Sequence, residues 1–179
     1  MANLLTAIRL LLVAPVAMAI VDADLFANWL LLALIFTAIV TDYFDGIVAR
    51  ALHTASARGM LFDHGTDFVF VTSSLFALAM IGLANVTLPV LIILAFTQYV
   101  LDSYFLFKQK MLRMSFLGRW NGILYFVPLV LVSVSRLSPF AFAQEFLETL
   151  ITYFCYALII STLASIVDRA IAPLRQGRN

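Results

Sequence analysis

Charge and cysteine are both scarce in this chain. Only 12% of its 179 residues are charged and 64% are hydrophobic, with a mean hydropathy of +1.04. Soluble domains are about half apolar and about a quarter charged, so this composition indicates an integral membrane protein instead. A single cysteine, Cys155, excludes an intramolecular disulfide, and no oxidising compartment is implied. The net charge of +1 gives no sign of a nucleic-acid-binding surface, so no nucleic-acid partner is expected.

Long linkers, low-complexity tracts and sequence repeats are also absent, which indicates a single domain over residues 1–179. A helix needs about 20 apolar residues to cross the hydrocarbon core of a bilayer. The segments that satisfy this are 4–21, 27–49, 66–83, 86–107, 120–136 and 147–170. We therefore predict an all-α integral membrane fold with six transmembrane helices in one bundle. The first is expected to be retained, because Arg9 lies inside the apolar run, whereas a signal peptide carries its positive charge before it.

The basic residues predict the orientation of the bundle. If the N-terminus is cytoplasmic, the regions on the inside hold Arg50, Arg58, Lys108, Lys110, Arg113, Arg119, Arg169, Arg175 and Arg178. The outside loops then hold Arg136, with the acidic residues Asp22, Asp24, Glu145 and Glu148. This distribution satisfies the positive-inside rule. We predict that both termini are cytoplasmic and that the protein resides in the cytoplasmic or inner membrane.

Four aspartates gather in the stretch "TDYFDGIVARALHTASARGMLFDHGTD", residues 41–67. Asp42 and Asp45 stand three residues apart near the cytoplasmic end of the second predicted helix. Asp63 and Asp67 stand four residues apart at the cytoplasmic start of the third. Each pair therefore shares one face of its helix. Packing the two helices together would direct four carboxylates into one small volume facing the cytoplasm.

Either protonation or bound cations must offset the charge of these carboxylates. Unneutralised charges at membrane depth cost several kcal/mol, and the nearby Arg50 and Arg58 are too few to balance four acids. Oxygen ligands without cysteine, with His53 and His64 off the two acidic faces, suit hard cations such as Mg²⁺ or Mn²⁺. Two divalent ions would balance four carboxylates. A two-metal site of this kind suits phosphoryl-type transfer.

Small residues beside the acids leave room for a ligand. Gly46 lies inside a predicted helix, where glycine costs about 1 kcal/mol relative to alanine, and Ala49 extends the same bare patch. Gly59 would let a ligand approach the backbone before the second acidic pair. Arg50 could contact phosphate oxygens. Spacing alone leaves two classes open, an enzyme and a cation-coupled membrane transporter.

The same residues carry a family resemblance. The segment "DYFDGIVAR" (residues 42–50), followed by Gly59, Asp63 and Asp67, matches the pattern D-x2-D-G-x2-A-R-x8-G-x3-D-x3-D. It resembles the signature of the CDP-alcohol phosphatidyltransferases at every specified position and spacing. The opening "NLLTAIRLLLVAP" (residues 3–15) is also similar to the N-terminal helix of that family. The resemblance extends over essentially the whole chain.

The resemblance implies an enzyme of phospholipid biosynthesis, a homodimer that transfers the phosphatidyl group of CDP-diacylglycerol to an acceptor hydroxyl and releases CMP. Two Mg²⁺ or Mn²⁺ ions would be held by Asp42, Asp45, Asp63 and Asp67. Asp67 would also act as the general base that deprotonates the acceptor. The residues expected around the CDP moiety are Gly46, Ala49, Arg50 and Gly59.

A basic segment, residues 108–120, is expected to reach the cytoplasmic face near this site. Arg113 and Arg119 are candidates for binding the phosphate of an anionic acceptor, and glycerol 3-phosphate is the acceptor that we expect. Inositol phosphate, inositol, serine and phosphatidylglycerol stay open as alternatives, because any cytoplasmic loop tends to be basic. A transporter would place its acids near the bilayer midplane on broken helices, whereas these acids are predicted toward one face.

Overall fold

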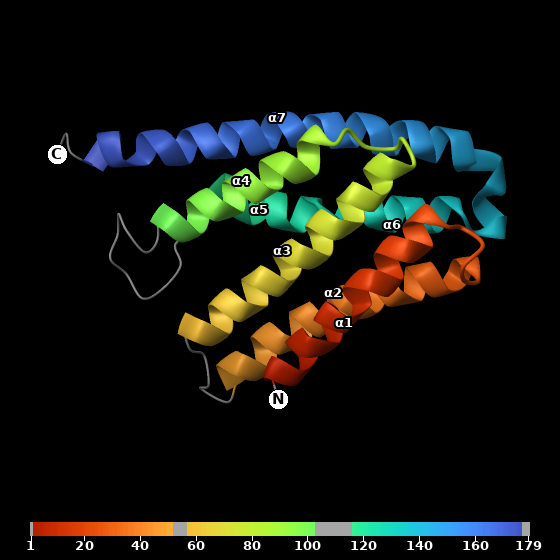
Figure 1. Cartoon of the computed structure of the whole chain (residues 1–179), viewed down its shortest axis with the longest axis horizontal. Helices are drawn as coiled ribbons and strands as arrows, with labels where there is room; N and C mark the ends of the chain where they lie inside the picture. Colours follow the sequence, from red (N-terminus) through yellow and green to blue (C-terminus); the bar gives the residue numbers. More distant parts are fainter. Residues whose placement is uncertain (1, 52–56, 103–115, 177–179) are drawn as a thin grey trace.

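Helices make up the part of the chain that the computed structural model describes, residues 2–51, 57–102 and 116–176 (Figure 1). The helices in chain order are α1 (Ala2–Val21), α2 (Asn28–Ala51), α3 (Ala57–Met80), α4 (Thr87–Leu101), α5 (Phe116–Leu124), α6 (Phe126–Ser135), the 3-10 helix η2 (Ser138–Ala143) and α7 (Gln144–Gln176). The described residues contain no strand. The all-α prediction is therefore confirmed for them.

The fifth predicted helix, residues 120–136, differs from the structure because it is divided into α5 and α6. The division falls at Tyr125, whose backbone N–H still donates to the carbonyl of Asn121 at 2.9 Å. Pro128 follows in the first turn of α6. Proline has no N–H to donate to the carbonyl four residues before it, which explains the break at this point.

The third helix begins before its apolar run. Residues 57–65, which precede the apolar segment 66–83, are helical, so α3 places Gly59 in its first turn and Asp63 in its second, in agreement with the prediction that Asp63 lies at the start of this helix. A search for apolar runs alone misses this part of the helix because it carries Arg58 and Asp63. Among the described helices, α3 packs most extensively against α1. Arg9 of α1 forms ion pairs with both Asp63 and Asp67 of α3.

Two helix ends are closed by defined contacts. At the end of α3, Gly82 has a φ of +81°, and Leu83 N–H donates to the carbonyl of Leu78 at 3.0 Å. This left-handed glycine with a bond back across the last turn is the usual way to end a helix. At the end of α1, the Arg136 guanidinium donates to the carbonyls of Ala19 and Ile20, each at 2.6 Å, and satisfies groups that have no partner within the helix.

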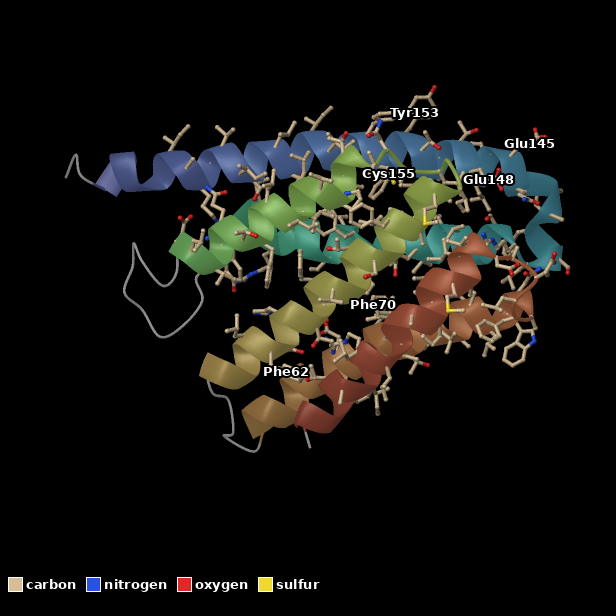
Figure 2. The ribbon with its side chains drawn as sticks, viewed as in Figure 1. Phe62, Phe70, Glu145, Glu148, Tyr153 and Cys155 are labelled. Carbon is tan, nitrogen blue, oxygen red and sulfur yellow. The ribbon has the colours of Figure 1, made fainter. Side chains whose placement is uncertain are left out.

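The core lies where α1, α2, α3, α6 and α7 meet, and its fully buried side chains include Val16, Ile20, Ile35, Phe70, Leu75, Leu78, Leu129 and Ile151. The Phe70 ring, labelled in Figure 2, stacks on Phe126 with centroids 5.9 Å apart. Many large apolar side chains point outward instead, for example Tyr153, which is 70% exposed. Such a surface suits contact with lipid, where close packing rather than the hydrophobic effect holds helices together.

Two helical stretches of the described chain are long and apolar enough to cross a membrane, Phe116–Ser135 and Ser138–Ile171. Shorter apolar helices run over Thr6–Val21, Asn28–Phe44 and Thr87–Leu101. The number of six spans therefore stays a prediction. In Figure 1 the first turn of α1 and the last turn of α7 lie toward the same end of the bundle, as the predicted topology requires.

Candidate active site

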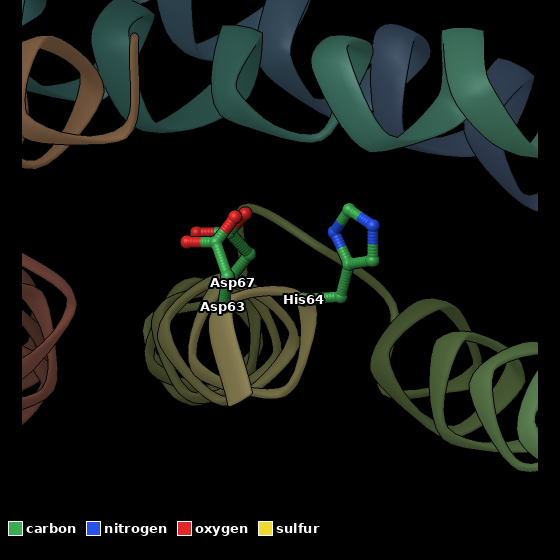
Figure 3. Close-up of side chains that lie close together, drawn as sticks. All are labelled: Asp63, His64 and Asp67. Carbon is green, nitrogen blue, oxygen red and sulfur yellow. The ribbon is translucent and has the colours of Figure 1, made fainter. Parts of the chain in front are cut away.

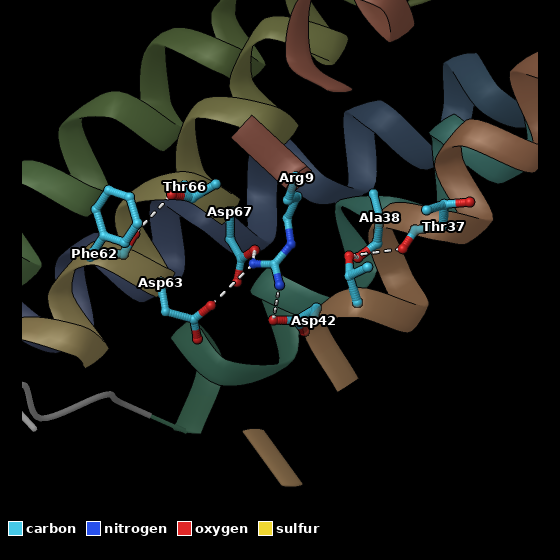
Figure 4. Close-up of polar contacts among 9 residues, drawn as sticks. Arg9, Thr37, Ala38, Asp42, Phe62, Asp63, Thr66 and Asp67 are labelled. Carbon is cyan, nitrogen blue, oxygen red and sulfur yellow. Dashed lines mark hydrogen bonds and ion pairs between the residues drawn. The ribbon is translucent and has the colours of Figure 1, made fainter. Parts of the chain in front are cut away.

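Three helices bring charged side chains to one point near the end of the bundle where α1 begins. Arg9 comes from α1, Asp42 from α2, and Asp63 and Asp67 from neighbouring turns of α3 (Figure 4). Arg9 Nη2 lies 3.2 Å from Asp42 Oδ1, and Arg9 Nη1 lies 3.2 Å from Asp63 Oδ1. Arg9 Nη1 also donates to Asp67 Oδ1. These four residues are called the acid cluster below.

The acid cluster is open on the side of its carboxylates and closed on the side of its cation. Arg9 has no exposed side-chain surface, whereas the side chains of Asp42, Asp63 and Asp67 are 42%, 27% and 25% exposed. A ligand can therefore reach the carboxylates from the surface without displacing the core. The guanidinium lies beneath them.

The cluster carries more negative than positive charge. One guanidinium faces three carboxylates, and Arg9 is itself incompletely satisfied, since its buried Nε has no hydrogen-bond partner among the described residues. Ion pairs at membrane depth are stabilising only when charges are paired and hydrogen-bonded. Protons or further cations would offset the remaining negative charge of the cluster.

His64 lies closer to the acids than the sequence indicated. A ring nitrogen of His64 and carboxylate oxygens of Asp63 and Asp67 all lie within 4.8 Å of one another. Figure 3 shows the two carboxylates on one side of α3 and the imidazole on an adjacent side. The imidazole of His64 thus projects from a different side of α3 than the two carboxylates, but one of its nitrogens still lies near their oxygens. Its ring also meets Tyr99 of α4 edge to face, with centroids 6.3 Å apart.

The donor set fits a divalent cation. Partly exposed carboxylate oxygens from α2 and α3 are the ligands that Mg²⁺ and Mn²⁺ prefer, and an adjacent imidazole is compatible with the softer of these, Mn²⁺. Asp45 lies one turn after Asp42 on α2, and its side chain lies outside the described residues.

The other predicted site residues are placed less fully. Gly46, Ala49 and Arg50 belong to the last turns of α2, although the side chains of this segment lie outside the described residues. Arg113 lies wholly outside them. Arg119 is exposed on α5, and the described part of the chain shows no contact between it and the three acids.

Arg9 is the site residue that sequence reasoning did not place. The signal was present, because a charged residue within an apolar run is costly and usually functional. In the sequence, Arg9 argues against a signal peptide and belongs to the N-terminal stretch that resembles the family, but neither observation gives it a role in the site. What the sequence did not reveal was that α1 packs along α3 and directs this side chain at the acids.

Comparison with known proteins agrees with the motif. Residues 1–163 match the family described as CDP-alcohol phosphatidyltransferase. Two relatives are named "CDP-diacylglycerol--glycerol-3-phosphate 3-phosphatidyltransferase". The protein of Mycoplasma genitalium is 33% identical over 100 residues, which cover 54% of this chain and 42% of the relative. The protein of Cereibacter sphaeroides is 32% identical over 124 residues, which cover 66% of this chain and 56% of the relative.

The chain thus spans about half the length of these curated relatives. No solved structure matches it significantly. The family match nevertheless covers most of the chain and includes all three acids that the structure brings together. The resemblance seen in the sequence is confirmed, and the chain belongs to the CDP-alcohol phosphatidyltransferase family.

Proposed function

We propose that this protein transfers the phosphatidyl group of CDP-diacylglycerol to the hydroxyl of glycerol 3-phosphate and releases CMP. The observation that carries the proposal is the meeting of Asp42, Asp63 and Asp67, three acids of the family pattern, in one partly exposed cluster. Family membership favours this chemistry over a cation-coupled transporter. Inositol phosphate, inositol, serine and phosphatidylglycerol are the competing acceptors.

The family is metal-dependent, and the described carboxylates suit a divalent ion. Two ions, Mg²⁺ or Mn²⁺, are proposed, with Asp42, Asp45, Asp63 and Asp67 as ligands. Ions bound there would polarise the pyrophosphate and stabilise the negative charge of the departing CMP. The open side of the acid cluster leaves Asp42, Asp63 and Asp67 accessible to such ions and to the substrate.

Asp67 is the proposed general base. In the reaction, the acceptor oxygen forms a bond to the phosphorus of the phosphatidyl group, the bond from that phosphorus to the bridging oxygen breaks, and CMP leaves with the oxygen. Asp67 takes the proton of the acceptor hydroxyl. Its carboxylate lies in the acid cluster and is 25% exposed, so an acceptor can reach it.

The small residues flanking the acids are proposed to receive the CDP moiety. Gly46 and Ala49 on α2 and Gly59 in the first turn of α3 offer little side-chain bulk, and Arg50 offers positive charge for the phosphates. Arg113 and Arg119 are the proposed contacts of the acceptor phosphate. The names of the two relatives support glycerol 3-phosphate as the acceptor.

The site is proposed to face the cytoplasm. The acid cluster lies toward the end of the bundle where α1 begins and α7 ends, and the positive-inside rule assigns that end to the cytoplasm (Figure 1). CDP-diacylglycerol would then reach the site from the bilayer, and the water-soluble acceptor from the cytoplasm. A homodimer is proposed on the family resemblance.

The proposal is tested by measuring CMP release from CDP-diacylglycerol by the purified protein. The assay contains Mg²⁺ or Mn²⁺ and, in separate reactions, glycerol 3-phosphate or one of the four competing acceptors. We expect turnover with glycerol 3-phosphate that stops when EDTA is added. Turnover with an uncharged acceptor alone would refute the role of Arg113 and Arg119. Cation flux in proteoliposomes without CMP release would refute the transferase.

A further inference from the structure

Arg9 contacts the same carboxylates that the proposed metal site requires. Its two terminal nitrogens contact the Oδ1 atoms of Asp42, Asp63 and Asp67, and the side chain is fully buried. Figure 4 shows the guanidinium between α2 and α3, beside these acids. The contacts therefore use one oxygen of each of three carboxylates that are proposed to bind metal.

Divalent ions bound to the same carboxylates would be repelled by the guanidinium of Arg9. Arginine stays positively charged at every accessible pH, so it cannot lower the repulsion by losing a proton. Like charges a few ångströms apart repel strongly in a site with a low dielectric constant. Each new bond from a carboxylate to a divalent ion should therefore weaken its contact with Arg9.

We propose that Arg9 is the counter-ion of the acid cluster in the metal-free protein and that it competes with divalent ions for the carboxylates. The guanidinium keeps the acids together when no metal is bound and gives up its contacts when metal binds. This inference rests on the proposed metal site. It adds that Arg9 weakens metal binding, which sets the metal concentration at which the site fills.

The opposite role is physically reasonable and gives the opposite result. If Arg9 only held the carboxylates in the correct arrangement for metal, its removal would disorder them and weaken metal binding. The sign of the change in metal affinity therefore separates a competitor from a scaffold. The assay needs no turnover and no lipid substrate.

The experiment measures binding of Mn²⁺ alone to the full chain in detergent, by electron paramagnetic resonance of the free ion. Arg9→Met removes the charge but keeps an apolar stem of similar length. We expect its Kd for Mn²⁺ to fall by about tenfold or more relative to the natural chain. Its Tm in EDTA should fall, and Mn²⁺ should restore it. An unchanged or higher Kd would overturn the proposal.

Three further variants keep the result interpretable. Arg9→Gln is a second neutral variant in case the methionine does not fold, and its Kd should change in the same direction. Arg9→Lys retains the charge and should keep the Kd within about threefold of the natural value. Arg136→Met is the matched control, because Arg136 is a partly buried arginine that contacts backbone carbonyls instead of acids.

The control should lose stability while its Kd for Mn²⁺ stays unchanged. Tighter Mn²⁺ binding by Arg136→Met would mean that any loosening of α1 improves metal access, and it would overturn the specific role of Arg9. If the natural chain binds no Mn²⁺, the metal site and the proposed function fail with this inference. If it binds Mn²⁺ and Arg9→Met binds it equally well, only the competitor role fails.

Discussion

Two charged contacts between helices of the described chain differ in charge balance. In the acid cluster, one buried arginine of α1 faces three aspartates of α2 and α3. Between α4 and α7, Arg169 faces Asp102, with Nη1 and Oδ2 3.9 Å apart. The Arg169 guanidinium also lies 5.0 Å from the centre of the Tyr99 ring.

This difference in charge balance suggests that the pair of Arg169 and Asp102 is structural, whereas the acid cluster is part of the active site. At the second position one arginine faces one aspartate of the other helix, with Asp168 beside it in the sequence, and the side chains of Arg169 and Asp102 are largely buried, at 11% and 15% exposure. The pair can join two helices without another ligand. The acid cluster has surplus carboxylates that are more exposed than their cation, so protons or further cations are needed to offset its charge.

The largest effect is expected from Asp67→Asn. An amide cannot accept the proton of the acceptor hydroxyl, so the rate of CMP release should fall by at least about 100-fold. Binding of CDP-diacylglycerol should be partly retained, because the other acids and the small residues near them are unchanged. Normal turnover by this variant would show that Asp67 is not the base.

Asp102→Asn makes the same chemical change in the ion pair of Arg169 and Asp102. Turnover should stay within about threefold of the natural rate, because the pair contributes to helix packing and not to the reaction. The Tm should fall by at least about 6 °C, because removing one partner of a largely buried ion pair costs about 3 kcal/mol or more. Thermal unfolding and CMP release measured on one preparation test both statements. A loss of turnover as large as that of Asp67→Asn would place Asp102 in the active site.

The acids could be predicted from sequence because their relation is local. Asp63 and Asp67 share a helical face whatever the helix packs against, and the same holds for Asp42 and Asp45. Apolar runs likewise located α1, α2, α4 and α7, because a segment of that composition and length has few alternatives to a helix.

Arg9 and His64 could not be placed in the same way. The partners of Arg9 lie more than thirty residues away and depend on how α1 packs against α2 and α3. His64 depends on the reach of one side chain across its own helix. The apolar run of α3 begins after its acidic start, and the arginine of α1 that offsets these acids depends on the packing of another helix.

The smallest effect is expected at a neutral contact between helices. The Tyr125 hydroxyl lies 2.8 Å from Thr162 Oγ1, in a buried position, and Thr162 also donates to the carbonyl of Leu158 at 2.6 Å. Tyr125→Phe removes one hydrogen bond and leaves Thr162 with its other partner. Hydrogen bonds between membrane helices contribute about 0.6 kcal/mol on average, so the Tm should fall by no more than about 2 °C.

Turnover and Mn²⁺ affinity should not change in Tyr125→Phe, because this contact carries no net charge and has no surplus group to be satisfied by a ligand. Thr162→Val removes the same hydrogen bond from the other side. Because both changes remove this one bond, the loss of stability in the double variant should not exceed the sum of the losses in the two single variants. A change in Mn²⁺ affinity would show that the contact between Tyr125 and α7 is coupled to the acid cluster. It would then be wrong to treat charge balance as the property that separates the structural contacts of this bundle from its active site.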